Sequence, residues 1–174
     1  MMQSILIIML AVLLIIAIYT DLRWSRIPNW LTFPAMGLGI VVHAWIGGQQ
    51  FALFSLSGIG VGMGLFLLPY ACKGIGAGDV KLMAAIGSMV GPSDALSVAI
   101  LSVLAGGLYA LGAMSYQWGM AATSKKLAFA TYGAVVTGGA TGVGDLQLPF
   151  KLRYGLAIAA GTILFQLGVH PFGG

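Results

Sequence analysis

Long runs of apolar residues constrain this chain more than any other feature of its sequence. Six such segments can be recognised, at residues 4–19, 30–46, 51–71, 80–90, 95–116 and 154–169. In lipid a segment must satisfy its own backbone hydrogen bonds, and only helices and closed barrels do so. The alternation of apolar and polar residues that marks a barrel strand is missing. The sequence therefore predicts an all-α, polytopic membrane protein with six transmembrane helices in a single domain, residues 1–174.

The scarcity of charged residues supports this prediction. Hydrophobic residues make up 59% of the chain and charged residues only 7%, whereas a soluble domain carries about 25% charged residues. The basic residues form no stripe that could follow a nucleic acid, so membrane lipid is the expected surrounding and no nucleic-acid partner is predicted. A single cysteine excludes an internal disulfide and a cysteine-based zinc site.

The basic residues also predict the orientation in the membrane. If the six segments alternate in direction, all eight Lys and Arg residues fall on one side, at positions 23, 26, 73, 81, 125, 126, 151 and 153. The positive-inside rule makes that side cytoplasmic, which places both termini on the non-cytoplasmic side of the cell inner membrane. The first segment has no basic residue before it and no small-residue cleavage site, so it is predicted to be a permanent span and no removed signal peptide.

Two of the four acidic residues stand at predicted cytoplasmic helix ends. Asp21 ends the first segment and Asp79 starts the fourth, so the topology brings both to one membrane side at similar depth. Ionisable side chains near the hydrocarbon are costly and are functional candidates. Two adjacent carboxylates can share a proton, after which one activates water and the other protonates the scissile carbonyl. This predicts an aspartyl hydrolase with Asp79, at a helix start, ionised and Asp21, at a helix end, protonated.

The short fourth segment predicts a water-filled cavity at these aspartates. Residues 80–90 rise only about 16 Å as a helix, against a hydrocarbon core of about 30 Å. Residues 74–78 are therefore predicted to be non-helical backbone at membrane depth, where it must line a cavity or be covered by protein. Without a Cβ, Gly76 and Gly78 can adopt φ > 0 and allow a substrate backbone to approach. Asn29 is expected to be the N-cap of the second helix.

The residues around both aspartates resemble the type IV prepilin peptidases. Residues 76–82 read GAGDVKL, which is similar to the GxGD signature of that family. Asp21 is followed by the basic Arg23 and by an Ile-Pro-Asn sequence that ends in Pro28 and Asn29. GxGD alone is weak, because residues 142–145, which end in Asp145, match it as well without a following span. A weaker likeness extends to residues 148–159.

The resemblance implies a GxGD aspartyl endopeptidase without metal or cofactor that removes the basic leader of prepilins at the cytoplasmic face. The expected partner is a prepilin with its leader and apolar N-terminal helix, and the oligomeric state stays open. Asp21 and Asp79 would be catalytic, while Lys81 and Arg23 would attract a substrate carboxylate, tune the pair or merely follow the charge rule. Larger members carry paired CxxC motifs and N-methyltransferase activity, whereas this chain, with one cysteine, resembles the short peptidase-only form of tight-adherence (Flp-type) pili.

Two other functions remain open at this point. A proton-coupled transporter or small channel would use Asp21 and Asp79 as relay carboxylates, although the internal repeat expected of many transporters is not visible. A non-catalytic assembly factor for a pilus or secretion machine would require neither carboxylate. Cleavage of a prepilin separates the peptidase from both.

Overall fold

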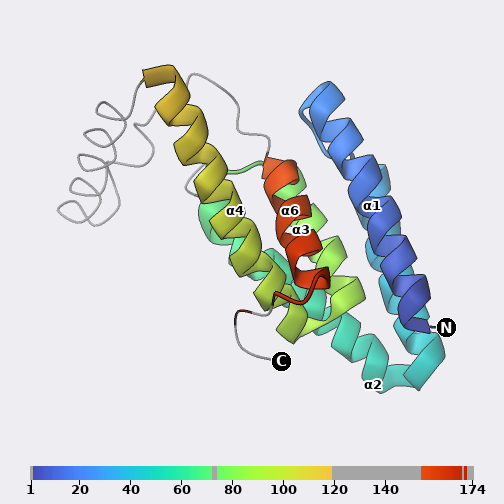
Figure 1. The fold of residues 1–174 in the computed structure, drawn as a ribbon. Coiled ribbons are helices and arrows are strands. Elements are labelled where there is room, and N and C mark those ends of the chain that lie inside the picture. Colours follow the sequence, from blue (N-terminus) through green and yellow to red (C-terminus); the bar gives the residue numbers. More distant parts are fainter. Residues whose placement is uncertain (1, 72–73, 119–153, 170, 172–174) are drawn as a thin grey trace.

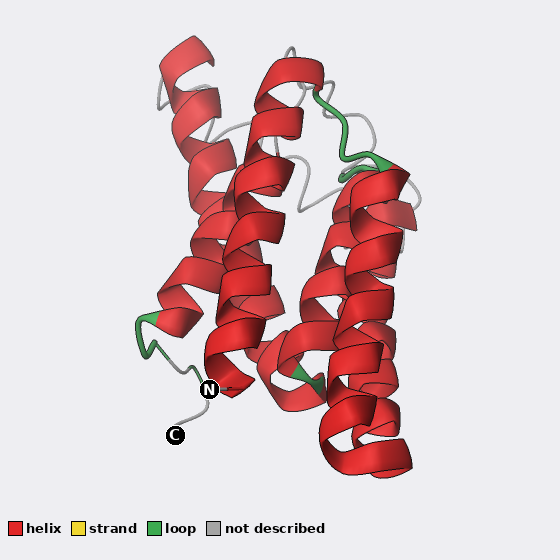
Figure 2. Cartoon of the chain, turned by 90° about the vertical axis from the view of Figure 1, so that its right-hand side faces the viewer, coloured by secondary structure: helices red, strands yellow, loops and turns green. Residues whose placement is uncertain are grey.

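Every regular element in the described part of the chain is an α-helix (Figure 1). The computed structural model describes residues 2–71, 74–118, 154–169 and 171, and this part contains no strand. The predicted all-α class is therefore confirmed for these residues. The helices are α1 (Met2–Trp24), α2 (Asn29–Ala71), α3 (Ala77–Val90), α4 (Pro92–Trp118) and α6 (Tyr154–Gln166). They run roughly along a common direction, as the side view shows (Figure 2).

Three of these helices are long and apolar enough to cross a membrane. They are Ser4–Trp24 within α1, Asn29–Ala71, which is the whole of α2, and Pro92–Ala113 within α4. The shorter α6 is apolar as well. Helix α3 has only 14 residues, which corresponds to a rise of about 21 Å. This is shorter than a hydrocarbon core of about 30 Å. The helices around α3 must therefore explain how it is accommodated in a membrane.

Helix α2 is in fact two helices that meet at Gly47 and Gly48. Both residues leave the helical region, with φ −136° and ψ 19° at Gly47 and φ 64° and ψ −149° at Gly48. A positive φ with such a ψ is open to glycine but strained for other residues. The break falls between the second and third predicted segments, and the chain reverses its direction there (Figure 1).

Contacts with α3 confirm that the two halves of α2 run in opposite directions. As the first half advances, its contacts move toward the end of α3, whereas those of the second half move toward its start. These contacts pair Asn29 with Lys81, Gly39 with Ser88, Gly58 with Gly87, and Gly62 with Met83. Helix α3 is therefore held between two antiparallel partners that belong to one stretch of chain.

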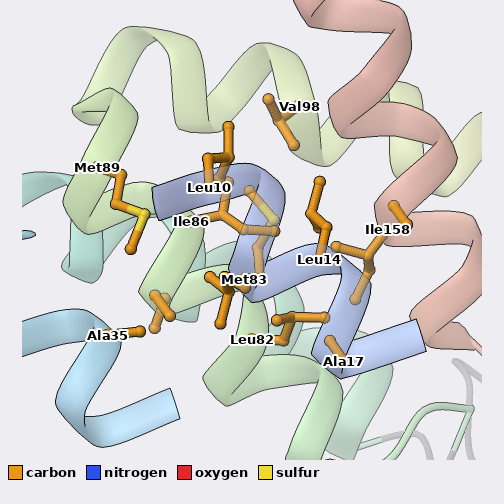
Figure 3. Packing of buried hydrophobic residues seen from close by; sticks show 14 of the residues in the cluster. Leu10, Leu14, Ala17, Ala35, Leu82, Met83, Ile86, Met89, Val98 and Ile158 are labelled. Carbon is orange, nitrogen blue, oxygen red and sulfur yellow. The ribbon is translucent and has the colours of Figure 1, made fainter. Parts of the chain in front are cut away.

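Helix α3 forms the centre of the hydrophobic core. Five consecutive residues, Leu82 to Ile86, are completely buried, so the helix has no exposed face over that length. Apolar side chains surround it from three other helices (Figure 3), namely Leu10, Leu14 and Ala17 of α1, Val98 of α4 and Ile158 of α6. Over this length α3 is therefore surrounded by protein side chains and not by lipid.

Two glycines form a close contact between the second half of α2 and α3. A Cβ at Gly58 would collide with the backbone carbonyl of Gly87, and a Cβ at Gly87 would collide with that of Gly58. Small residues of this kind let two helix backbones approach each other within a membrane. Beside this contact the Ser55 hydroxyl donates a hydrogen bond of 2.7 Å to the carbonyl of Ser88. The second half of α2 is thereby fixed against α3.

Candidate active site

Asp79 lies in the first turn of α3, where the backbone holds its carboxylate. The Gly76 N–H donates a hydrogen bond of 2.9 Å to Asp79 Oδ2. In return the Asp79 N–H donates to the Gly76 carbonyl at 3.1 Å. The side chain is buried, with 9% of its surface exposed. A carboxylate in this position also interacts favourably with the positive end of the helix dipole.

The backbone that precedes Asp79 differs from the prediction. Helix α3 begins at Ala77, so Gly78 is helical, and Gly76 has φ −84° and ψ 156°. Positive φ among the described glycines occurs at Gly48, Gly91 and Gly168. Gly76 and Gly78 therefore do not use the positive φ that glycine permits. The cause is the hydrogen bond between Gly76 and Asp79, which stabilises an earlier start of the helix than the apolar pattern alone suggests.

Gly78 has a packing role instead. A Cβ at this position would lie 3.1 Å from Cβ of Ile27 and 3.3 Å from its backbone nitrogen. Ile27 is buried and belongs to the connection between α1 and α2. The absence of a side chain at Gly78 thus lets the start of α3 lie directly against that connection, close to the end of α1.

Asp21 lies one turn before the end of α1 and is 6% exposed. Its backbone carbonyl accepts a hydrogen bond of 2.9 Å from the Ser25 N–H, and Ser25 has a positive φ of 49° that ends the helix. The carboxylate packs against Gly155 of α6, where a Cβ would lie 2.8 Å from Asp21 Oδ2. Asp21 is therefore enclosed between α1 and the first turn of α6.

The start of α6 borders the surroundings of Asp21. Gly155 contacts the Asp21 carboxylate, and Tyr154 precedes it as the first residue of α6. Neither residue was predicted as a site residue from the sequence. An aromatic residue and a glycine at the start of a predicted span give only a faint signal, because such pairs also occur at membrane interfaces.

Lys81 is held by the start of α2. Its Nζ donates a hydrogen bond of 2.9 Å to Oδ1 of Asn29 and lies 5.3 Å from the ring centroid of Phe33. Asn29 is the first residue of α2, and the Pro28 carbonyl accepts a hydrogen bond from the Leu31 N–H at 3.2 Å. Asn29 is therefore not the N-cap that the sequence predicted. Its side chain instead links α2 to α3.

Arg23 and Asp145 are the remaining residues that the sequence singled out. Arg23 lies in the last turn of α1 with an exposed side chain. The second GxGD-like match, which ends in Asp145, lies outside the described residues, as do the basic residues at 73, 125, 126, 151 and 153. In the ranges that the structure covers, no three His, Cys, Asp or Glu side chains gather in a way that could hold a metal ion.

We expect the contact between Lys81 and Asn29 to be cooperative. In a double-mutant cycle, Lys81→Met and Asn29→Leu should each lower the free energy of unfolding, while the coupling between them amounts to about 0.5–1 kcal/mol, because either change removes the same hydrogen bond. Denaturant unfolding in detergent measures this value. The exposed Arg23, as Arg23→Met, supplies the control pair with Asn29→Leu. Full additivity of Lys81→Met and Asn29→Leu would contradict the cross-link.

A cavity of about 440 Å³ lies at the opposite ends of the helices. It is bordered by His43, which is buried and whose Nδ1 donates a hydrogen bond of 2.9 Å to the Gly39 carbonyl. Neither Asp21 nor Asp79 lines this cavity. It is therefore distinct from the predicted water-filled cavity at the aspartates, which stays a prediction.

Fold and site together define a helical membrane protein with two buried carboxylates near helix ends. The profile of the type IV leader peptidase family matches residues 8–111, which is more than half of the chain and includes Asp21 and Asp79. The chain belongs to the type IV leader peptidase family, and hence to a family of proteases.

Two curated relatives are consistent with this assignment. Over 95 residues the chain is 32% identical to the prepilin leader peptidase/N-methyltransferase of Burkholderia pseudomallei strain 1026b, and equally to that of strain K96243. The aligned stretch is 49% of this chain and 30% of each relative, so the chain corresponds to less than a third of their length. No solved structure gives a significant match.

Proposed function

We propose that this protein is a prepilin leader peptidase that removes the basic leader from type IV, Flp-like prepilins. The observation that carries the proposal is the arrangement of Asp21 and Asp79. Both are buried near helix ends within the stretch matched by the family, and Asp21 contacts Gly155 at the start of α6. Membership of a leader peptidase family supports a peptide as the substrate.

The two carboxylates divide the chemistry of peptide hydrolysis. Asp79, held by the Gly76 N–H at the start of α3, accepts a proton from water, and the resulting hydroxide attacks the scissile carbonyl carbon. Asp21 donates its proton to the carbonyl oxygen as the tetrahedral intermediate forms. When the C–N bond breaks, the leaving amine takes a proton from Asp79. A hydroxyl of the intermediate returns a proton to Asp21 as the new carboxyl group forms, so Asp79 is again ionised and Asp21 again protonated, and the pair titrates as one unit.

The orientation of the chain follows from its basic residues and from the two halves of α2. If these halves span separately, six helical segments alternate and all Lys and Arg residues face the cytoplasm of a cell with the chain in its inner membrane. The two aspartates then lie at the cytoplasmic end of the bundle, where a basic leader remains after the apolar prepilin helix has entered the membrane.

Reporter fusions test this orientation. Alkaline phosphatase at the C-terminus should be active and green fluorescent protein at the same position dark, because both termini are proposed to lie outside the cytoplasm. Fusions after residue 126 should give the reverse pattern. A fluorescent C-terminal fusion together with an inactive phosphatase would contradict the six-span arrangement.

We further propose that the protein does not methylate its product. The chain has one cysteine and therefore no paired CxxC motifs. The two activities in the name of the Burkholderia relatives are theirs, and the aligned stretch covers only 30% of them. Mass spectrometry of the cleaved prepilin in the presence of S-adenosylmethionine should find an unmodified N-terminal amine.

The deciding experiment uses the purified protein in lipid nanodiscs with a full-length type IV prepilin. Cleavage between the basic leader and the apolar helix, located by mass spectrometry, supports the peptidase. A prepilin that stays intact, although an established leader peptidase cleaves the same preparation, would reject it. A transporter or an assembly factor gives that second result.

A further inference from the structure

The first two residues of α6 lie outside the stretch matched by the family profile and within the weaker likeness at residues 148–159. The matched stretch ends at residue 111, whereas Tyr154 and Gly155 begin the last helix. Helix α6 nevertheless contacts α1 and α3, the two helices that carry the aspartates, and packs extensively on α4. Its start is thus positioned to influence the site from outside the matched region.

Gly155 leaves no space for a side chain beside Asp21. It is buried, and a Cβ would lie 2.8 Å from Oδ2, 3.2 Å from Cγ and 3.4 Å from Cβ of Asp21. Cβ atoms in proteins essentially never lie within 3.0 Å of a non-bonded heavy atom of another residue. An alanine at 155 must therefore displace the carboxylate or α6. The position of the Asp21 carboxylate therefore depends on glycine at 155.

Tyr154 is held between two other helices. Its ring makes an edge-to-face contact with Phe66 of α2, with ring centroids 6.0 Å apart and an interplanar angle of 72°. On the α4 side a Cβ at Gly106 would lie 2.6 Å from the nearest ring carbon and 2.8 Å from the hydroxyl oxygen. The ring thus fills the space that glycine leaves at 106, which directs the hydroxyl and fixes the start of α6.

We propose that Tyr154 and Gly155 are positioning residues of the peptidase site: Gly155 gives the Asp21 carboxylate its seat against the backbone of α6, and Tyr154, wedged between α2 and α4, presents its hydroxyl to the same site. This inference rests on the proposed function. The phenol adds a hydrogen-bond donor one residue from the contact of Gly155 with the Asp21 carboxylate.

The Gly155→Ala variant tests the seat of Asp21. In nanodiscs we expect kcat for prepilin cleavage to fall about 100-fold with KM within about threefold of the wild type, because a shift of about 1 Å in a reacting group costs that much in rate. The matched control is Gly107→Ala on α4, where an added Cβ meets nothing within 4 Å. It should leave kcat, KM and the thermal unfolding midpoint unchanged.

Two variants test the Tyr154 hydroxyl in different ways, and both keep the backbone of α6. Tyr154→Phe removes the hydroxyl, whereas Gly106→Ala pushes the ring away from its place. Each should lower kcat about tenfold at unchanged KM, as expected for the loss of a hydrogen bond to a charged group. The adjacent Gly107→Ala is again the control, so neighbouring glycines on one helix should behave differently.

The outcomes separate this inference from the proposed function. If Asp21→Asn and Asp79→Asn are inactive while Gly155→Ala, Tyr154→Phe and Gly106→Ala keep wild-type kcat, the positioning role is rejected and the peptidase stands. A raised KM at normal kcat would also reject it, since it would indicate substrate binding. Should Gly155→Ala fail to fold, Tyr154→Phe and Gly106→Ala decide. Cleavage by both aspartate variants rejects the two-carboxylate mechanism, whereas a prepilin that the wild type leaves intact rejects the proposed function itself.

Discussion

Replacing Asp79 by asparagine should reduce prepilin cleavage by about 10³-fold or more, and Asp21→Asn should do the same. An amide can neither accept the proton of the attacking water nor donate one to the scissile carbonyl, and positioned proton transfer contributes about 10² to 10⁴ in rate. Because the two carboxylates act on one water and one carbonyl, the double variant should be no slower than either single variant. Initial rates of leader release, followed by mass spectrometry, measure the effect.

Asp94→Asn is the matched control for these variants. Asp94 lies in the first turn of α4, where its Oδ1 accepts a hydrogen bond from the Ser93 hydroxyl at 3.1 Å, and it borders the cavity at the opposite ends of the helices. This variant should cleave at the wild-type rate. All variants should elute as the wild type does in size-exclusion chromatography. Full activity of either Asp21→Asn or Asp79→Asn would rule out the two-carboxylate mechanism.

Gly78→Val should lower kcat by about 100-fold although position 78 carries no reacting group. A β-branched side chain there meets the buried Ile27, to which even a Cβ would come within 3.1 Å. The start of α3 must then move away from the end of α1, and Asp79 moves with it. Catalysis is sensitive to such displacements, since about 1 Å costs about 100-fold. Steady-state cleavage of the prepilin provides the measurement.

Gly64→Val provides the comparison for this change. Gly64 lies in the second half of α2, and a Cβ there meets nothing within 4 Å. The same side chain introduced at this position should leave kcat and the thermal unfolding midpoint close to those of the wild type. Equal losses in Gly78→Val and Gly64→Val would show that the effect comes from valine in a helix and not from the contact with Ile27.

The apolar pattern was sufficient to predict the helices because lipid leaves the backbone few alternatives. Five predicted segments lie within helices and the last, 154–169, extends three residues beyond α6, while the break at Gly47 and Gly48 was visible as a glycine pair between two apolar runs. Helix ends were less accurate. Helix α1 continues to Trp24 rather than ending at residue 19, because polar residues at the membrane surface continue a helix without an apolar signal.

The two aspartates could be found from the sequence, but their surroundings could not. Asp79 stands out by the local GAGD sequence, whose effect on the helix start is also local. The contact of Asp21 with Gly155 joins the first helix to the last, and no local pattern encodes it. Lys81 was placed correctly at a helix start, yet its partner Asn29 follows only from the way in which α2 folds back beside α3.

The fold-back of α2 changes the demands on α3. Wrapped by both halves of α2 and by α1, α4 and α6, the central helix has neighbours of protein where most membrane helices have acyl chains. It can therefore be short, begin with an aspartate and a lysine and contain a buried serine at 88, all of which lipid would penalise. Polar side chains can therefore be accommodated or replaced on this one helix, while the helices around it keep the apolar surface that contacts the lipid.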